Sequence, residues 1–272
     1  MVQRVKVLFV TGEVAPFTKA ESSAIGPLAR HLSESLHVSG QFETRIMMPR
    51  YGLISERRNR LHEVIRLCGA SIPMGGGKET LKVKVASIPG IRLQVYFMDN
   101  ARFFKRKGLH QDKEGRLYQD NHERSMFFCR SVLETVRRLR WKPDIVHAFG
   151  WISGLLPVLL STSEYREKSD HSLFADTRVI YTPDNVEPDA NLTPALASQL
   201  SRLQMLNGSA PSDLTEFIGQ PIADVGLKYS DLSAFPDSVP PAKEAVQLLG
   251  NASEIAEQTI KLYESALGDP AK

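Results

Sequence analysis

The sequence predicts an α/β protein, a three-layer domain of Rossmann type in which a mostly parallel sheet lies between helices. Three observations predict this class. Short apolar runs of strand length alternate with longer stretches of helical periodicity. Most of the short runs are continuous in apolar residues, as expected for strands buried on both faces. The chain contains no internal repeat and no low-complexity linker, so we expect residues 1–272 to form one domain.

Prolines and glycines separate the elements of the first half of the chain. The first apolar run ends at Thr11-Gly12, which indicates a buried strand. Apolar residues at helical spacing follow, with Pro27 tolerated in the first turn of their helix. The next run stops at Pro49, two more are joined by Pro89-Gly90, and a long amphipathic helix comes after them. In order, these elements cover residues 5–10 (strand), 24–36 (helix), 44–48 (strand), 81–88 and 91–98 (hairpin) and 121–140 (helix).

The second half continues the alternation with shorter elements. A three-residue apolar run behind Pro143 indicates a buried strand, and the apolar stretch after it indicates a helix. The next strand ends in the turn residues Thr182-Pro183-Asp184-Asn185. Residues 186–225 are rich in Pro, Ser and Asp, and we expect them to be irregular apart from one helix. In order, these elements cover residues 144–146 (strand), 153–160 (helix), 178–181 (strand), 194–206 (helix), part of 227–235 (strand) and 244–267 (terminal helix).

Composition argues against several classes of function. The net charge is only +3, with 34 Lys and Arg mixed among 31 Asp and Glu, so no broad positive field is offered to nucleic acid or an anionic membrane. No apolar run approaches the roughly 20 residues of a membrane span, and no signal-peptide pattern opens the chain, which predicts a cytoplasmic protein. Two cysteines are too few for a disulfide framework or a cysteine zinc site. We therefore expect no metal, no cofactor, no nucleic-acid partner and no membrane association.

Glycine-rich phosphate-binding motifs are not found in their usual contexts. No Gly-x-Gly-x-x-Gly follows the first strand, and no Walker pattern occurs. The segment 74–78, MGGGK, precedes a strand rather than a helix, so a flexible turn is a better interpretation than a phosphate cradle. The cluster 103–107, FFKRK, combines aromatic and basic residues, but it is short and isolated. We expect solvated charges beside two packed rings there, rather than a nucleic-acid site.

Two places in the sequence carry candidate binding residues. Asp120 or Asn121 can cap the long helix, but capping does not explain Arg124, a cation one turn too early to complement the helix dipole. His147 stands at the expected end of its strand, and Trp151 follows four residues later. Ligands bind outside the carboxyl ends of strands in open α/β sheets, which favours a site at these residues. A core role for the lone histidine and for the tryptophan is the alternative.

Five ordered segments carry a resemblance to a known family. They are KVLFVTGEVAPFTK near the N-terminus, IMMPRYG at 46–52, VYFMDN at 95–100, GLHQDKEGRLYQDNHERSMFFCRSVLE at 108–134 and PDIVHAFGWISGLLPVLL at 143–160. Together they resemble the N-terminal catalytic domain of bacterial glycogen synthases and plant starch synthases. The likeness is close over residues 4–160 and is limited to topology after Asn185.

The resemblance implies a fold, an activity and a set of binding residues. The family has the GT-B arrangement, two Rossmann-type domains facing a cleft, and transfers glucose from ADP-glucose or UDP-glucose to an α-1,4-glucan with retention. Its first domain holds the acceptor, and its second holds most of the nucleotide site. The resemblance implies that this chain is equivalent to the first domain and lacks the donor-binding second one. No catalytic residue is assigned. The vestigial candidates for substrate binding are Lys19, Asn121, Arg124, His147, Trp151 and Asn185.

Several positions depart from the family pattern. Lys19 is followed by Ala-Glu-Ser-Ser instead of Thr-Gly-Gly-Leu, which removes glycines that allow close approach to a phosphate and adds a negative charge. The family's His-Ala-x-Asp-Trp-His has Gly150 in place of the Asp and Ile152 in place of the second His, so two hydrogen-bonding groups are lost. Asp184 replaces the histidine of the family's Thr-x-His-Asn. The segments that form the family's site are therefore kept, but several of the polar residues and glycines within them are replaced.

These observations leave three hypotheses. We favour a stand-alone, synthase-like pseudoenzyme that does not transfer glucose unaided and binds an α-glucan, a maltooligosaccharide or a partner glycosyltransferase chain. The first alternative is a glycosyltransferase completed by self-association or by a separate donor-binding chain. The second is a structural or interaction protein in which residues 186–225 cover the carboxyl ends of the strands and bury Phe149 and Ile152. A structure without an open cleft beside His147 would favour this last hypothesis.

Overall fold

The computed structural model describes residues 4–18, 23–166, 173–186, 188–203, 212–241 and 245–268. The strands are β1 (Val5–Thr11), β2 (Phe42–Pro49), β3 (His62–Glu63), β4 (Ala70–Met74), β5 (Gly77–Ser87), β6 (Gln94–Asp99), β7 (Ile145–Phe149), β8 (Arg178–Thr182), β9 (Leu232–Pro236) and β10 (Val246–Leu248). The helices are α1 (Ile25–Ser39), α2 (Glu56–Asn59), α3 (Ala101–Phe104), α4 (Asn121–Leu139), α5 (Leu156–Leu160), α6 (Ser163–Arg166), α7 (Pro194–Ser201), α8 (Ile222–Tyr229) and α9 (Ala252–Leu267). The described residues also form three short 3-10 helices, η1 (Ile65–Leu67), η2 (Trp151–Ser153) and η3 (Ser212–Phe217).

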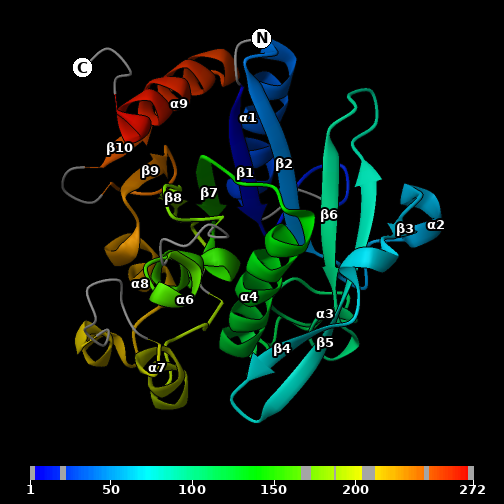
Figure 1. Ribbon diagram of the computed structural model, residues 1–272, viewed down its shortest axis with the longest axis vertical. Coiled ribbons are helices and arrows are strands. Elements are labelled where there is room, and N and C mark those ends of the chain that lie inside the picture. The colour runs from blue at the N-terminus through cyan, green and yellow to red at the C-terminus, as the bar shows by residue number, and fades with distance from the viewer. Residues whose placement is uncertain are drawn as a thin grey trace.

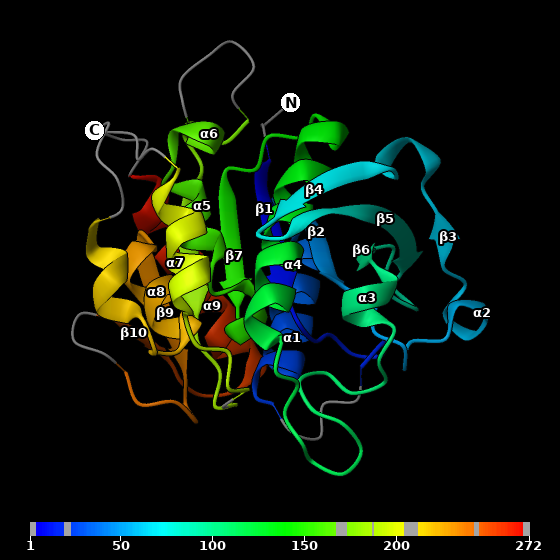
Figure 2. The ribbon, with the colours of Figure 1, turned by 90° about the horizontal axis from the view of Figure 1, so that it is seen from below.

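A mixed, mostly parallel sheet forms the middle layer, as predicted (Figure 1). Its strand order is β10-β9-β8-β7-β1-β2-β6-β5-β3, and β4 pairs with β5 outside this path. Strands β10 through β6 in this order pair in parallel, whereas β5 runs antiparallel to β6, β3 and β4. Figure 2 shows β10 and β3 at opposite ends of the molecule.

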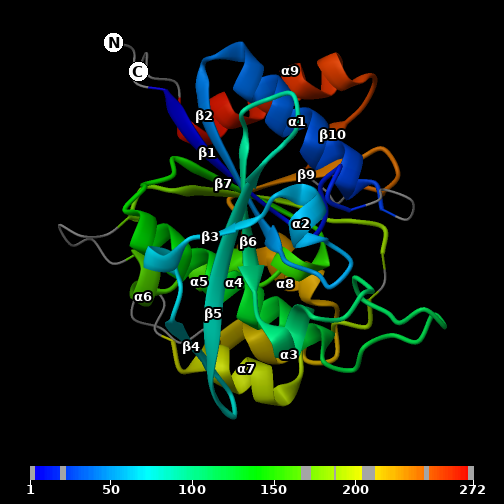
Figure 3. The ribbon, with the colours of Figure 1, turned by 90° about the vertical axis from the view of Figure 1, so that its right-hand side faces the viewer.

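Helices cover both faces of the sheet. Helices α1 and α9 pack together on one face, and α4 and α5 pack on the other (Figure 3). Apolar side chains from both layers meet those of the central strands, and the β1 residues from Val7 to Val10 are fully buried. Burial on both faces explains why β1 reads as a continuous apolar run rather than an alternating one.

The strand order places a switch point between β1 and β7. From β1 the chain crosses through α1 to β2 on one side, and later returns to place β7 on the other side. Thr11 at the end of β1 lies in register with Phe149 at the end of β7. In doubly wound sheets the loops after two such strands separate and leave a crevice that can bind a ligand.

The structure confirms the predicted strands and the predicted β5–β6 hairpin, adds the unpredicted strands β3 and β4, and changes the second half of the chain. Residues 186–225 are not irregular apart from one helix, because η3 and the first half of α8 follow α7 within them. Helix α7 ends at Ser201, inside the predicted range. The predicted helix over 244–267 begins only at Ala252, because β10 occupies 246–248. Asn251 and Glu254 form a capping box that starts α9 there.

The glycine-rich segment 74–78 is the turn of the β4–β5 hairpin. Met74 pairs with Gly77, so Gly75 and Gly76 form the tip. A Cβ atom on Gly75 would lie 2.3 Å from Nε2 of Gln199, so the glycine lets the hairpin tip approach α7. The segment leads into β5, as the sequence predicts, and no helix N-terminus follows it.

Candidate functional site

A pocket of about 570 Å³ lies at the carboxyl ends of β7, β8 and β9. We call it the Trp151 pocket. Its walls are mostly apolar and include Leu117, Trp151, Pro183, Val186, Pro188, Ile222, Leu227 and Phe235. Its acidic lining residues are Asp184, Asp189 and Asp224. Among the described residues, no Lys, Arg or His lines it. The pocket is therefore an apolar hollow with carboxylates at its wall.

The turn after β7 brings Trp151 and Asp184 together. Gly150 has φ 71, a left-handed conformation that favours glycine, and its N–H donates to the carbonyl of Thr182 at 2.8 Å. The N–H of Trp151 donates to Oδ2 of Asp184 at 3.4 Å. A Cβ atom at position 150 would lie 2.5 Å from this oxygen. A side chain at 150 and the Asp184 carboxylate therefore compete for one space, so the glycine at 150 and the acid at 184 fit each other.

Two carboxyl groups near this turn have raised pKa values. Burial raises the pKa of Asp184 to about 6. Burial, and then the charge of Asp184, raises the pKa of Glu13 to about 7. Oε2 of Glu13 is buried and has no hydrogen-bond partner among the described residues. Burial likewise raises the pKa of Tyr51, which is fully buried and senses the charges of Glu13 and Asp184. The carboxyl groups of Glu13 and Asp184 are therefore each protonated for part of the time near neutral pH.

Arg124 lies fully buried behind Trp151, among aromatic rings. Its Cζ atom is 5.8, 5.6, 5.1 and 6.0 Å from the ring centres of Tyr51, Phe104, Tyr118 and Trp151. Burial lowers the pKa of its guanidinium. None of the ion pairs in the described part of the chain involves Arg124, so the rings are its main neighbours.

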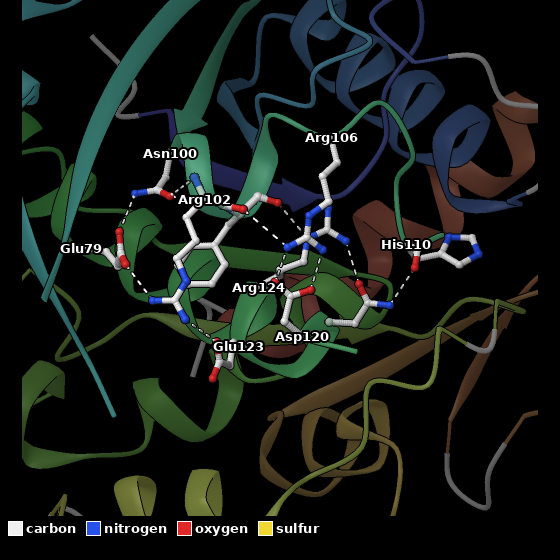
Figure 4. Close-up of polar contacts among 10 residues, drawn as sticks. Glu79, Asn100, Arg102, Arg106, His110, Asp120, Glu123 and Arg124 are labelled. Atoms are coloured by element: carbon white, nitrogen blue, oxygen red, sulfur yellow. Dashed lines mark hydrogen bonds and ion pairs between the residues drawn. The ribbon is translucent and has the colours of Figure 1, made fainter. Parts of the chain in front are cut away.

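Hydrogen bonds hold Arg124 in place (Figure 4). Its Nε donates to the carbonyl of Phe103 at 2.9 Å, and its Nη1 donates to Oδ1 of Asn121 at 2.7 Å. Nη2 has no partner among the described residues. Asn121 in turn donates to the carbonyls of His110 at 2.8 Å and Pro188 at 2.7 Å. Because Pro188 lines the Trp151 pocket, Asn121 and Arg124 connect α4 to the pocket wall.

Asp120 takes the N-cap position of α4, as predicted, but its side chain makes no capping hydrogen bond. It forms an ion pair with Arg106 instead, and this pairing lowers the pKa of its carboxyl against the effect of burial. Arg102 similarly holds Glu79 at 2.9 Å and Glu123 at 3.2 Å (Figure 4). These charges therefore connect α3 and the loop that follows it to β5 and to the start of α4.

His147 lies in the core rather than at a strand end. Strand β7 continues to Phe149, so the prediction that the strand stops before His147 is wrong. The ring is fully buried and stacks on Phe149 at 3.9 Å. Its Nδ1 is 2.7 Å from the hydroxyl of Tyr263 on α9, and its Nε2 is 2.8 Å from Oγ1 of Thr182. Burial lowers its pKa to about 3. Both ring nitrogens are occupied by protein groups, so neither is presented to the pocket.

The structure brings three of the six candidate residues together. Asn121, Arg124 and Trp151 form the pocket wall and its support, and 7% of the surface of Trp151 is exposed. His147 faces α9 instead, and Asn185 is exposed outside the pocket. Lys19 lies outside the described residues.

The sequence analysis did not select Glu13 and Tyr51, and it treated Asp184 only as a departure from a pattern. All three follow a parallel strand directly: Glu13 comes after β1, Tyr51 after β2 and Asp184 after β8. Ligands in open α/β sheets bind outside the carboxyl ends of the strands. Considering the residues after every parallel strand, and not only after β7, would have selected all three.

The remaining classes of site have less support. The described residues contain no group of three or more His, Cys, Asp or Glu placed to hold a metal ion. In the same part of the chain, no helix combines the length and apolar character needed to cross a membrane. Burial raises the pKa of the Cys129 thiol to about 12, so this cysteine stays protonated and unreactive.

Comparisons with known proteins show the family and support the fold. Residues 6–232 match a family model described as the starch synthase catalytic domain. A glycogen synthase from Chlorobium limicola is 42% identical over 182 residues, which cover 66% of this chain and 36% of that protein. A glycogen synthase from Chlorobaculum parvum is 35% identical over 229 residues, which cover 84% of this chain and 44% of that protein. The chain thus spans less than half the length of these curated relatives.

One solved structure has a similar fold. It is the catalytic domain of Starch Synthase IV from Arabidopsis thaliana bound to ADP and acarbose, with a TM-score of 0.64 and 18% sequence identity. The match covers 97% of this chain and 50% of that one. At this identity the likeness supports the fold alone.

Proposed function

The chain belongs to the family of starch synthase catalytic domains, and from this membership we propose that its Trp151 pocket binds a segment of an α-glucan. The observation that carries the proposal is the lining of the pocket. A sugar ring has an apolar face that packs on an aromatic side chain, and hydroxyl groups that donate hydrogen bonds to carboxylates. The exposed part of Trp151 supplies the first contact, and Asp184, Asp189 and Asp224 supply acceptors.

The same lining is unsuited to a nucleotide sugar. A leaving diphosphate needs cations or N–H groups aimed at its charge. The described lining of the Trp151 pocket offers three aspartates and no cation, so a diphosphate would be repelled there. We therefore propose that this pocket serves the glucan, and that glucose transfer needs a donor site built by residues other than those that line it.

A glycosyltransferase acting from ADP-glucose to an α-1,4-glucan is the second candidate. Family membership supports it, as does the fold shared with a catalytic domain whose title names ADP and acarbose. In this hypothesis, self-association of the chain or a separate donor-binding chain completes the donor site. It predicts that glucose incorporation appears only in a complex of defined stoichiometry.

The third hypothesis, a filled cleft, has partial support. Phe149 and Ile152 are buried, as it expects, and α8 packs against η2 and α5. His147 is also fully buried and does not line the Trp151 pocket, which is the outcome that favours this hypothesis. A Cβ atom on Gly154 would lie 2.8 Å from the carbonyl oxygen of Ile222, which shows how closely α8 approaches. The 570 Å³ pocket beside Trp151 nevertheless stays open, and this favours a binding function.

Titration calorimetry of the purified protein tests the proposal. We expect saturable binding of maltooligosaccharide and of acarbose, and no binding of ADP-glucose in this pocket. Trp151→Ala should weaken glucan binding roughly tenfold or more, since an aromatic platform contributes on the order of 1 kcal/mol beyond its buried area. Asn185→Ala, an exposed position outside the pocket, is the matched control and should bind like the wild type.

A second variant guards against a folding defect. Asp189 is exposed at the pocket wall with φ 51, a conformation that asparagine tolerates, so Asp189→Asn should fold normally and bind glucan more weakly. Absence of glucan binding by the folded wild type would refute the proposal. Glucan elongation from ADP-glucose by the purified chain alone would instead establish the second candidate.

A further inference from the structure

A second hollow lies at the other end of the sheet from the Trp151 pocket. It is a groove of about 900 Å³ between α2, β3 and the turn that joins β5 to β6. We call it the arginine groove. Its apolar lining includes Phe17, Val85, Ile88 and Ile91, and its basic lining residues are Arg58, Arg60, His62 and Arg92. Of the residues that the structure describes, no Asp or Glu lines it.

The local backbone sets these basic side chains along one groove. Helix α2 ends at Asn59, and Arg60, whose φ is 52, turns the chain toward β3. His62 on β3 pairs in register with Val85 of β5, and both line the groove. Side chains alternate between the faces of a strand, so Glu63 points to the opposite face from His62. The nearest acid on β3 therefore does not neutralise the groove.

The other nearby acid is already engaged. Glu56, at the start of α2, forms ion pairs with Arg50 and Lys84. These contacts lower the pKa of its carboxyl, and the hydrogen bond from Lys84 is the largest cause. Its negative charge is thus balanced by cations that do not line the groove.

The arginines of the groove are not neutralised by ion pairs with the described residues. Elsewhere, arginines such as Arg30, Arg102 and Arg138 hold carboxylates within 4 Å. In the described part of the chain, Arg58, Arg60 and Arg92 take part in no ion pair. Solvated arginines at the edge of a sheet also discourage pairing with another chain. Protection of a sheet edge would not require these arginines to line a groove, and it would not require the groove to lack carboxylates.

We propose that the arginine groove binds a small ligand carrying two or more phosphate groups. Each guanidinium presents a planar set of donors that matches a pair of phosphate oxygens, and three arginines line this one groove. The groove is within the size range of small-molecule sites. A polyanionic macromolecule is the weaker fit, because it needs an extended positive field and the whole chain has a net charge of only +3.

Calorimetry with inorganic tripolyphosphate at low salt tests this proposal. We expect saturable binding that weakens as salt is added. The double variant Arg58→Gln/Arg92→Gln should lose about a hundredfold in affinity, roughly tenfold for each charged hydrogen-bond donor removed. The control Arg57→Gln/Arg66→Gln makes the same change in charge on exposed side chains of α2 and η1 that do not line the groove. It should keep most of the affinity.

Three outcomes would overturn the proposal. The first is no saturable binding by the folded wild type. The second is an equal loss in both double variants, which would indicate a diffuse field. The third is tighter binding of a polyglutamate peptide than of tripolyphosphate, which would indicate an acidic protein partner. The substituted side chains make no ion pairs among the described residues, so both double variants should fold, and thermal unfolding checks this.

Discussion

Acidification should destabilise this protein partly through His147. The neutral ring is held between the hydroxyls of Tyr263 and Thr182, and burial lowers its pKa from 6.5 to about 3. Below pH 6.5 the unfolded chain takes up a proton on this histidine, whereas the folded chain does so only near pH 3. The histidine's contribution to stability is therefore complete above 6.5 and is lost as the pH falls toward 3. Between about pH 7 and pH 5 the loss works out at about 2 kcal/mol.

Urea unfolding of the wild type and of His147→Gln at these two pH values measures the effect. The wild type should lose about 2 kcal/mol more than the variant on going from the higher pH to the lower one. The comparison is needed because Glu13 and Asp184 act in the opposite direction. Their raised pKa values of about 7 and about 6 mean that the stability they contribute is lost as the pH rises through those values.

Tyr263→Phe provides the control. It removes the hydroxyl that contacts Nδ1 but keeps a titratable histidine in the same place. It should lower the free energy of unfolding by about 1–3 kcal/mol at both pH values and leave the pH dependence in place. An equal pH dependence for the wild type and His147→Gln would refute the reasoning, since it would mean that the folded protein protonates His147 as readily as the unfolded chain.

Two further substitutions test the polar groups beside the Trp151 pocket. Arg124→Leu leaves the Phe103 carbonyl and the Asn121 carboxamide without their donor, so the free energy of unfolding should fall by about 2–4 kcal/mol, and Arg124→Lys should recover part of it. An unchanged urea midpoint for Arg124→Leu would contradict this. Asp184→Asn should lower the pKa of Glu13, because the charge of Asp184 helps to raise it. An NMR titration of the Glu13 carboxyl that is the same in both proteins would show that the two acids do not interact.

The strands of the parallel core were predictable because a strand that is buried on both faces is a short continuous apolar run, which can be recognised in the sequence. Strands β1, β2, β7 and β8 are short apolar runs, and their order along the chain predicts the α/β class. The elements that were missed have no such recognisable pattern in the sequence. Strand β10 has three residues, and α8 has eight and contains Gly226, so neither has the length that identifies an element in the sequence.

The candidate site was predictable only in part. Trp151 was selected because it follows a parallel strand, and Asn121 and Arg124 because helix capping did not account for the arginine. The sequence could not show that Asp184 lies against Gly150, or that Pro188 accepts a hydrogen bond from Asn121 across 67 positions of the chain. Such contacts depend on how the loops after different strands meet, and no local pattern encodes that.

By itself, the sequence determined the family, the α/β class and the place of Trp151 after a parallel strand. The tertiary structure decided which polar groups face a pocket and which serve the core. His147 shows the difference, because its partner Tyr263 lies 116 positions away on the last helix. A histidine's role depends on what surrounds its two nitrogens and how far water is excluded. Those are properties of segments brought together by folding, and the spacing of residues along the chain does not contain them.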